Sequence, residues 1–169
     1  INQKNVKNLK VAWIYNSNDG IGQIQSNPII VEDKIITPTP GHYVVAINSK
    51  SGEEIWRFKS KSKFPAQRGL VYWEGNEKSN PGIFFSDQAG LYKLNTSNGV
   101  LDSSFGNKGF IKTNLSKTTP VIINDNLIIS TFAPSIDIID INNGKTKWKF
   151  FLKKNYNGYY LNSSSRLGG

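Results

Sequence analysis

One stretch of the chain decides the fold because it recurs: Val44-Val45-Ala46-Ile47-Asn48-Ser49-Lys50-Ser51-Gly52-Glu53-Glu54-Ile55-Trp56-Arg57-Phe58. A second copy reads Ile138-Ile139-Asp140-Ile141-Asn142-Asn143-Gly144-Lys145-Thr146-Lys147-Trp148-Lys149-Phe150. A third, weaker copy reads Leu91-Tyr92-Lys93-Leu94-Asn95-Thr96-Ser97-Asn98-Gly99 and ends near Phe105. The glycines of the copies, Gly52, Gly99 and Gly144, lie 47 and 45 residues apart. Self-similarity at such a period indicates a protein built from repeated units.

Each unit predicts four short strands. In the first unit they cover residues 28–31, 34–37, 43–47 and 54–58, and the third unit begins in the same way with residues 120–123 and 127–130. These runs are rich in Val, Ile and aromatic residues and are bounded by Asn, Asp and Gly, which form turns. Gly52 closes a tight turn between the third and fourth strands, where a positive φ is expected.

The tryptophans of the repeat fall on the fourth, outermost strand of each unit. Residues 9–15 match only the last part of the unit, and Trp13 precedes Trp56 by 43 residues. A large flat side chain at this place can fill the space between neighbouring sheets. We therefore expect Trp13, Trp56 and Trp148 to be structural rather than ligand-binding residues.

The pattern predicts an all-β protein, a β-propeller of four-stranded antiparallel blades. Four strands per unit at this period are typical of propellers, whereas a β-sandwich would lack the self-similarity. The units divide the chain into five parts. Residues 1–26 form a lead-in with the outer strand of a closing blade, and three blades follow at residues 27–60, 68–110 and 117–154. Residues 155–169 are the truncated start of a next segment. A closed propeller needs at least four blades, so we expect an incomplete ring whose exposed sheet edges could self-associate.

Composition excludes several classes of site. The chain has no cysteine, which rules out disulfides, thiolate chemistry and zinc–sulfur sites. Its formal charge is +9, but the lysines are scattered, which favours a solvated surface over a nucleic-acid-binding one. No apolar run is long enough to cross a membrane. His42, the single histidine, follows Pro40-Gly41 at a loop tip and is expected to be solvated.

Several segments resemble the N-terminal part of the quinoprotein alcohol and glucose dehydrogenases, enzymes that use pyrroloquinoline quinone (PQQ). Residues 1–13 are similar to the start of their mature domain, and residues 23–28 followed by residues 48–58 to their first full blade. Arg68-Gly69-Leu70-Val71-Tyr72-Trp73 resembles their RG-aromatic segment, Phe105-Gly106-Asn107-Lys108-Gly109 their SFG-x-x-G turn, and Thr118-Thr119-Pro120 their TSP segment. The absence of a vicinal cysteine pair favours the glucose-dehydrogenase-like branch over the methanol type.

The resemblance implies an eight-bladed propeller, of which this chain supplies about three blades, with PQQ on its axis. Such enzymes oxidise a sugar or alcohol hydroxyl: a carboxylate takes the hydroxyl proton, hydride passes to the quinone, and Ca²⁺ polarises the quinone oxygen. It also implies a periplasmic location or the outer face of the inner membrane, with any membrane association through parts outside this chain.

The resemblance assigns four cofactor-binding residues. Gln25 stands where the family has a Gln or Glu that touches PQQ, and Arg68 stands where it has an arginine whose planar fork suits a carboxylate or a quinone oxygen. Thr118 belongs to the TSP segment, which supplies a hydroxyl to a PQQ carboxylate, and Thr131 is a weaker match to a family serine. The catalytic aspartate and most Ca²⁺ ligands are expected beyond Gly169, so this chain alone is predicted to be inactive.

Other acidic residues near these segments receive no catalytic role. Residues 131–135 lack the acidic Ca²⁺ ligand that methanol-type members carry nearby, and no metal ligand is assigned in this chain. Asp137 and Asp140 belong to a strand and a turn of the third blade.

Two other functions stay open. PQQ-like repeats also build non-catalytic propellers, such as the outer-membrane assembly scaffold lipoprotein, which bind proteins through loops and sheet edges. Gln25, Arg68, Thr118 and the SFG-x-x-G turn are not needed in a scaffold, and they favour the enzyme. A nucleic-acid binder is suggested by the charge alone.

Overall fold

The computed structural model describes residues 1–133 and 135–151, and it is built almost entirely from strands. A single turn of 3-10 helix, Val6–Asn8, lies near the start. The first sheet consists of β1 (Ile29–Val31), β2 (Lys34–Pro38), β3 (Tyr43–Asn48) and β4 (Glu54–Lys59). The second consists of β5 (Val71–Trp73), β6 (Gly82–Ser86), β7 (Gly90–Leu94) and β8 (Phe110–Lys112). The third consists of β9 (Val121–Ile123), β10 (Asn126–Thr131), β11 (Ser135–Asp140) and β12 (Thr146–Phe151).

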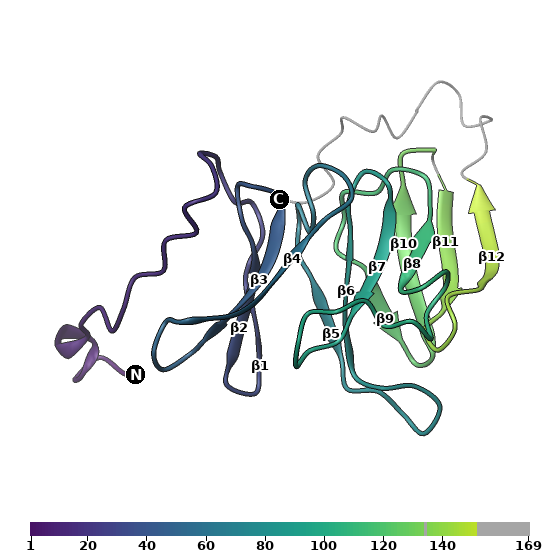
Figure 1. The fold of residues 1–169 in the computed structure, drawn as a ribbon. Coiled ribbons are helices and arrows are strands. Elements are labelled where there is room, and N and C mark those ends of the chain that lie inside the picture. Colours follow the sequence, from purple (N-terminus) through teal and green to yellow (C-terminus); the bar gives the residue numbers. More distant parts are fainter. Residues whose placement is uncertain (134, 152–169) are drawn as a thin grey trace.

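Each sheet is antiparallel, and its strands lie side by side in the order in which they occur in the sequence. The three sheets follow one another in chain order, from blue to green in Figure 1. The first strands of the sheets are neighbours, with β1 against β5 and β5 against β9. This arrangement confirms the all-β class and the partial propeller of four-stranded blades. Residues 152–154 of the predicted third blade and the predicted segment 155–169 lie outside the described residues.

The first tryptophan joins the lead-in to the first sheet. Trp13 Nε1 donates a hydrogen bond to the carbonyl oxygen of Ser49, at 3.1 Å, and its ring covers Gly52. Gly52 has a φ of +76°, and a Cβ at this position would come within 2.7 Å of the ring. Glycine is therefore required both for the turn and for the close approach.

The second tryptophan repeats this contact between the first and second sheets. Trp56 Nε1 donates to the carbonyl oxygen of Thr96 at 3.0 Å, and its ring lies over Gly99, which has a φ of +69°. Trp13 and Trp56 thus confirm the prediction that tryptophans fill the space between units. Trp148 lies on β12 with 52% of its surface exposed, and its role stays a prediction.

The junction between the second and third sheets has no tryptophan on its fourth strand, β8; its tryptophan is Trp73, which lies on β5 in the apolar cluster between these two sheets. The backbone N–H of Gly106 donates to the carbonyl oxygen of Asn143 at 2.9 Å, and Ile111 packs beside Gly144. In the other two junctions, a tryptophan ring covers the turn glycine. Here Gly144 is covered instead by the turn at residues 105–109 and by the short strand β8. Phe105 is not on the fourth strand of this unit but is buried beneath the turn.

Two apolar clusters hold the three sheets together. The cluster between the first and second sheets contains Val44, Trp56, Phe85 and Tyr92, with the rings of Phe85 and Tyr92 stacked at 5.0 Å. The cluster between the second and third sheets contains Phe84, Phe105, Leu127 and Ile139. Because each sheet buries one face against its neighbour, burial of these side chains fixes the order of the blades.

A polar cluster fixes the lead-in to the outermost strand of the first sheet. The Arg57 guanidinium pairs with Glu54 at 2.6 Å and with Asp19 at 3.2 Å, and it donates to the Tyr15 hydroxyl at 3.1 Å. The hydrogen bond from Arg57 holds the pKa of Glu54 below its usual range, and burial with a bond to Glu54 raises the pKa of Tyr15 to about 12. These contacts set the path of the chain toward Gln25.

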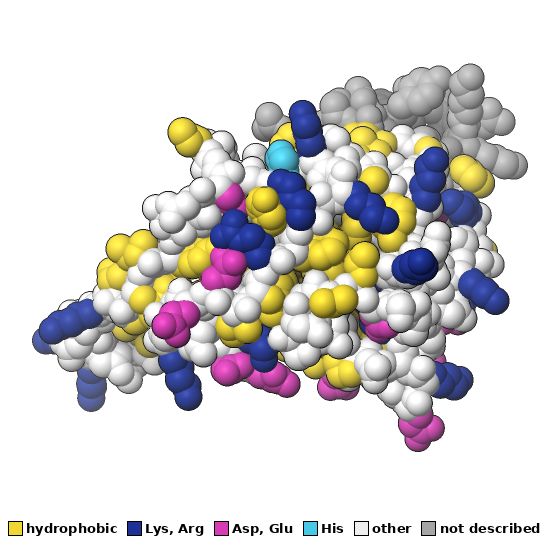
Figure 2. Space-filling view, in the orientation of Figure 1, with side chains coloured by type: hydrophobic (Ala, Val, Ile, Leu, Met, Phe, Trp, Pro, Cys, Tyr) yellow, Lys and Arg dark blue, Asp and Glu magenta, His cyan; other side chains and the backbone are white. Residues whose placement is uncertain are grey.

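Surface charge is dispersed on the face seen in Figure 2. Lys and Arg side chains are spread over this face among hydrophobic, uncharged and acidic ones.

Candidate functional site

The predicted site residues gather at one end of the three sheets. In an antiparallel blade, the segment before the first strand and the turn between the second and third strands lie at the same end. Gln25, Arg68 and Thr118 precede β1, β5 and β9 by three or four residues, and Thr131 is the last residue of β10. We call this end the inner rim and define it as residues 21–25, 64–69, 118–119 and 130–131.

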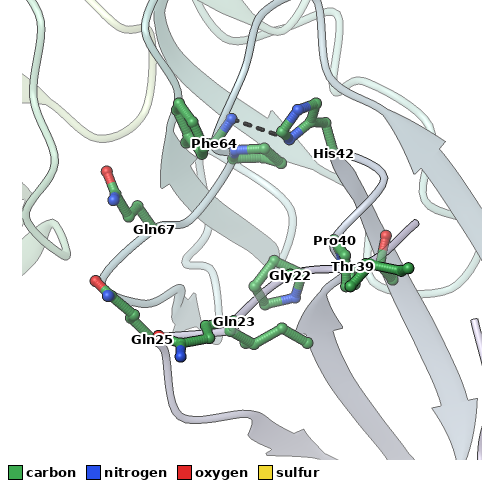
Figure 3. Close-up of a pocket in the computed structure, with 12 residues that line it drawn as sticks. Gly22, Gln23, Gln25, Thr39, Pro40, His42, Phe64 and Gln67 are labelled. Carbon is green, nitrogen blue, oxygen red and sulfur yellow. Dashed lines mark hydrogen bonds between the residues drawn. The ribbon is translucent and has the colours of Figure 1, made fainter. Parts of the chain in front are cut away.

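A pocket of about 360 Å³ opens in the first part of the inner rim. Its walls come from the lead-in, from the turn between β2 and β3, and from the loop that joins β4 to β5 (Figure 3). Gln25 lies in the wall, together with Gln23 and Gln67. The lining, all of it within the described residues, contains no Asp, Glu, Lys or Arg, so the pocket offers hydrogen bonds rather than charge.

His42 lines this pocket from the β2–β3 loop, as its predicted loop position allows, but it is half-buried rather than fully solvated. The side chain is half-buried because the β2–β3 turn folds against the loop that carries Phe64. The Phe64 backbone N–H donates to His42 Nδ1 at 3.3 Å, and the two rings meet edge to face at 5.3 Å (Figure 3).

Phe64 and Gln67 are two further pocket residues that the sequence did not suggest. Phe64 has a φ of +58° and keeps 46% of its surface exposed, an unusual state for a bulky residue. Gln67 Oε1 is buried and has no hydrogen-bond partner among the described residues. Neither feature is visible in the sequence, because both depend on contacts across the loop.

Arg68 follows the pocket directly and is exposed. Its carbonyl oxygen accepts a hydrogen bond from Thr119 Oγ1 at 2.8 Å. The next residue, Gly69, has a φ of +145°, and a Cβ there would lie 2.5 Å from the same hydroxyl oxygen. The glycine therefore lets the Arg68 segment approach the segment before β9.

The two predicted threonines differ in what they offer. Thr118 is half-buried, and its hydroxyl lies 3.0 Å from Ser130 Oγ. Thr131 is buried, and its hydroxyl lies 2.8 Å from Ser135 Oγ, which donates to Asp137 at 2.8 Å. Thr118 is thus the better placed of the two to reach a ligand on the rim.

Three of the predicted residues, Gln25, Arg68 and Thr118, are connected through a shared pocket, adjacent chain positions and one hydrogen bond. Gln25 and Gln67 share the pocket, Arg68 follows Gln67 in the chain, and the carbonyl of Arg68 is bound to Thr119 beside Thr118. A guanidinium, amides and a hydroxyl are hydrogen-bond donors of the kind that carboxylates and quinone oxygens accept.

The described residues contain no group of three His, Cys, Asp or Glu side chains that could hold a metal ion. Within the same residues, no helix has the length and apolar character needed to cross a membrane.

Known proteins with similar sequences and folds point to one family. The family model described as "Glucose/ethanol/alcohol dehydrogenase, beta-propeller domain", with the name PQQ, matches residues 1–118. The quinoprotein glucose dehydrogenase of Escherichia coli is 28% identical over an alignment that covers 89% of this chain and 24% of that protein. The chain spans about a quarter of the length of the curated relatives that align with most of it.

Two solved structures share the fold. The quinohemoprotein alcohol dehydrogenase of Comamonas testosteroni has a TM-score of 0.66 at 22% identity, covering 89% of this chain and 24% of that one. BamB from Moraxella catarrhalis has a TM-score of 0.60 at 15% identity, covering 83% of this chain and 39% of that one. The family match covers more than half of the chain, in the part that contains Gln25, Arg68 and Thr118. The chain therefore belongs to the PQQ family of glucose/ethanol/alcohol dehydrogenase β-propeller domains.

Proposed function

We propose that this chain is part of a quinoprotein dehydrogenase that oxidises a hydroxyl group of a sugar or an alcohol with bound PQQ. The observation that carries the proposal is the inner rim, where Gln25, Arg68 and Thr118 precede the first strands of three successive blades of a PQQ-family propeller. The proposal includes Ca²⁺ in the full-length protein and a place in the periplasm or at the outer face of the inner membrane.

The rim residues would hold one edge of the cofactor. PQQ, when bound, supplies the quinone that accepts a hydride from the hydroxyl-bearing carbon of the substrate. Arg68 would bind a carboxylate or a quinone oxygen through its planar fork, and Thr118 would donate its hydroxyl hydrogen. Gln25 and Gln67 would orient the neutral parts of the ligand through their amides. The proton-accepting carboxylate and most Ca²⁺ ligands would come from blades outside this chain.

A substrate of the sugar type is the version that we favour. The pocket that Gln25 and Gln67 line contains no Asp, Glu, Lys or Arg among its described residues. Any part of it that the cofactor leaves open would suit hydroxyl groups, which both donate and accept hydrogen bonds. The chain also has no cysteine and so lacks the vicinal pair of the methanol type.

A protein-binding scaffold is the second candidate, because BamB shares the fold. The fold therefore does not separate the two functions. The rim supports the enzyme, because an exposed arginine beside a pocket whose described lining has no charged side chains suits a small ligand.

The test is turnover by the full-length protein, purified without cofactor and supplied with PQQ and Ca²⁺. We expect reduction of an electron-accepting dye with an aldose or an alcohol, dependent on added PQQ. Absence of PQQ-dependent turnover across both substrate classes would contradict the proposal. Residues 1–169 alone should be inactive under the same conditions, and turnover by this chain would refute the claim that the base lies elsewhere.

A further inference from the structure

Residues 60–68, within the segment that joins β4 to β5, carry part of the inner rim. Phe64 and Gln67 line the pocket from this loop, and Arg68 ends it. Phe64 and Ala66 have φ values of +58° and +50°, which non-glycine residues rarely adopt. Such conformations persist when the surrounding structure holds them in place, so the contacts that hold the loop matter for the site.

A buried carboxylate in the next blade anchors the start of this loop. Asp87 lies in the turn between β6 and β7 and is 1% exposed. Its Oδ2 accepts bonds from the Ser60 hydroxyl at 2.5 Å and from the Ser62 N–H at 2.9 Å. The Tyr92 hydroxyl donates to the same oxygen at 2.7 Å.

The remaining contacts show that Asp87 serves the loop as well as its own turn. Its Oδ1 accepts the backbone N–H groups of Ala89 and Gly90 at 2.7 and 3.0 Å. Among the described residues no cation forms an ion pair with it, so hydrogen bonds alone stabilise the buried charge. Two of those five bonds come from residues 60–62, and removal of the charge would release them.

Further hydrogen bonds hold the loop beyond this anchor. The Ala66 N–H donates to the carbonyl oxygen of Ser86 at 2.9 Å, one residue before Asp87. On the other side, the Phe64 N–H donates to His42 of the first blade. The loop is therefore clamped between the β2–β3 turn of one blade and the β6–β7 turn of the next.

We propose that Asp87 is a positioning residue, which acts through Ser60 and Ser62 to hold residues 60–68 in the conformation that presents Gln67 and Arg68 to a ligand. The identity of that ligand as PQQ rests on the proposed function. The competing explanation is that Asp87 only stabilises its own blade.

The test compares Asp87→Asn with Asp102→Asn in the full-length protein. Asp102 is a matched control because it lies in the second blade, where its carboxylate pairs with the buried Lys93 at 2.7 Å, and none of its hydrogen bonds reaches residues 60–68. The first readout needs no cofactor: trypsin cleaves after Lys61, Lys63 and Arg68, all of which lie in the loop. The second is the dissociation constant of PQQ, measured by fluorescence titration.

We expect Asp87→Asn to speed cleavage in the loop and to weaken PQQ binding, each by about tenfold, because bonds to a charged acceptor are lost. Ser60→Ala, which removes one anchoring bond, should shift both readouts in the same direction and replaces Asp87→Asn if that variant does not fold. Asp102→Asn should lower stability without a selective effect on the loop.

The proposal would be overturned if Asp87→Asn and Ser60→Ala left the rate of loop cleavage at the wild-type value. It would also be overturned if Asp102→Asn raised that rate as much as Asp87→Asn does. A wild-type protein that binds no PQQ would refute the proposed function instead, and the trypsin comparison would still decide the role of Asp87.

Discussion

The choice of side chain at some positions is decided by contacts with the neighbouring blade. Gly99 must have a positive φ and must also leave room for the Trp56 ring, which lies 2.5 Å from where its Cβ would be. We expect Gly99→Ala to lower the free energy of unfolding by about 1–3 kcal/mol. Gly22→Ala is the control, because a Cβ there meets only Pro40, at 3.4 Å. Urea unfolding measures the stability of both variants, and equal free energies of unfolding would contradict this account.

Asp102 gives a pH-dependent prediction at the same scale. Burial alone would raise the pKa of Asp102, but hydrogen bonds from Lys93 and Ser104 outweigh burial and hold it below its usual range. The native pKa therefore lies below the unfolded value of about 4, so the stabilisation is complete above that pH and is lost as the pH falls through the native pKa.

Asp102→Asn should cost about 3–5 kcal/mol at pH 7, because it leaves the fully buried Lys93 without its counter-ion. The difference between wild type and variant should shrink as the pH is lowered below about 4. Urea unfolding at a series of pH values measures it, and a difference that stays constant with pH would argue against the ion pair.

The sequence could suggest candidate site residues only where a motif marks them. Gln25, Arg68 and Thr118 stand in segments with a family pattern, and the structure brings them to one rim. His42 and Phe64 could not be found, because their contact joins two loops 22 residues apart. No local pattern predicts the positive φ of Phe64, since such values normally indicate Gly or Asn.

Strands were predictable because each is bounded by turn residues. β2 and β3 lie within one residue of their predicted limits, and the turns at Gly52 and Gly144 have the expected positive φ. β8 was not predicted, because the chain between β7 and β8 makes a long excursion through residues 95–109. This segment buries Phe105, and its Gly106 binds Asn143 of the third blade where the other junctions use a tryptophan. No local pattern in the sequence indicates this arrangement.

The part of the lead-in at residues 14–19 forms no strand, and Arg57 on β4 holds it in place. Arg57→Met should release residues 14–19, because the contacts to Tyr15 and Asp19 are lost. The cost should be roughly 1 kcal/mol, since the ion pairs are partly exposed. Hydrogen exchange should rise severalfold at residues 14–19 and stay unchanged at β6. Lys50→Met, in an exposed turn, is the control, and equal exchange in both variants would contradict the assignment.

At the scale of the whole molecule, the outer face of the third blade is uncovered in the described part of the chain. Trp148 and Phe150 on β12 are each 52% exposed. Because apolar side chains of this size favour burial, we expect residues 1–169, produced alone, to self-associate with rising concentration. Trp148→Lys should weaken the association, and Lys147→Gln on the same strand should not. Sedimentation that shows monomers at all concentrations would contradict this expectation.

The central claim is that this chain forms one rim of a PQQ site in a longer propeller. The most direct measurement is the titration of the cofactor-free full-length protein with PQQ, comparing wild type, Arg68→Lys and Arg68→Ala. We predict binding by the wild type that weakens by about 10- to 100-fold in Arg68→Ala, with Arg68→Lys between the two because it keeps the charge but not the fork. Equal affinity of wild type and Arg68→Ala for PQQ would contradict the claim.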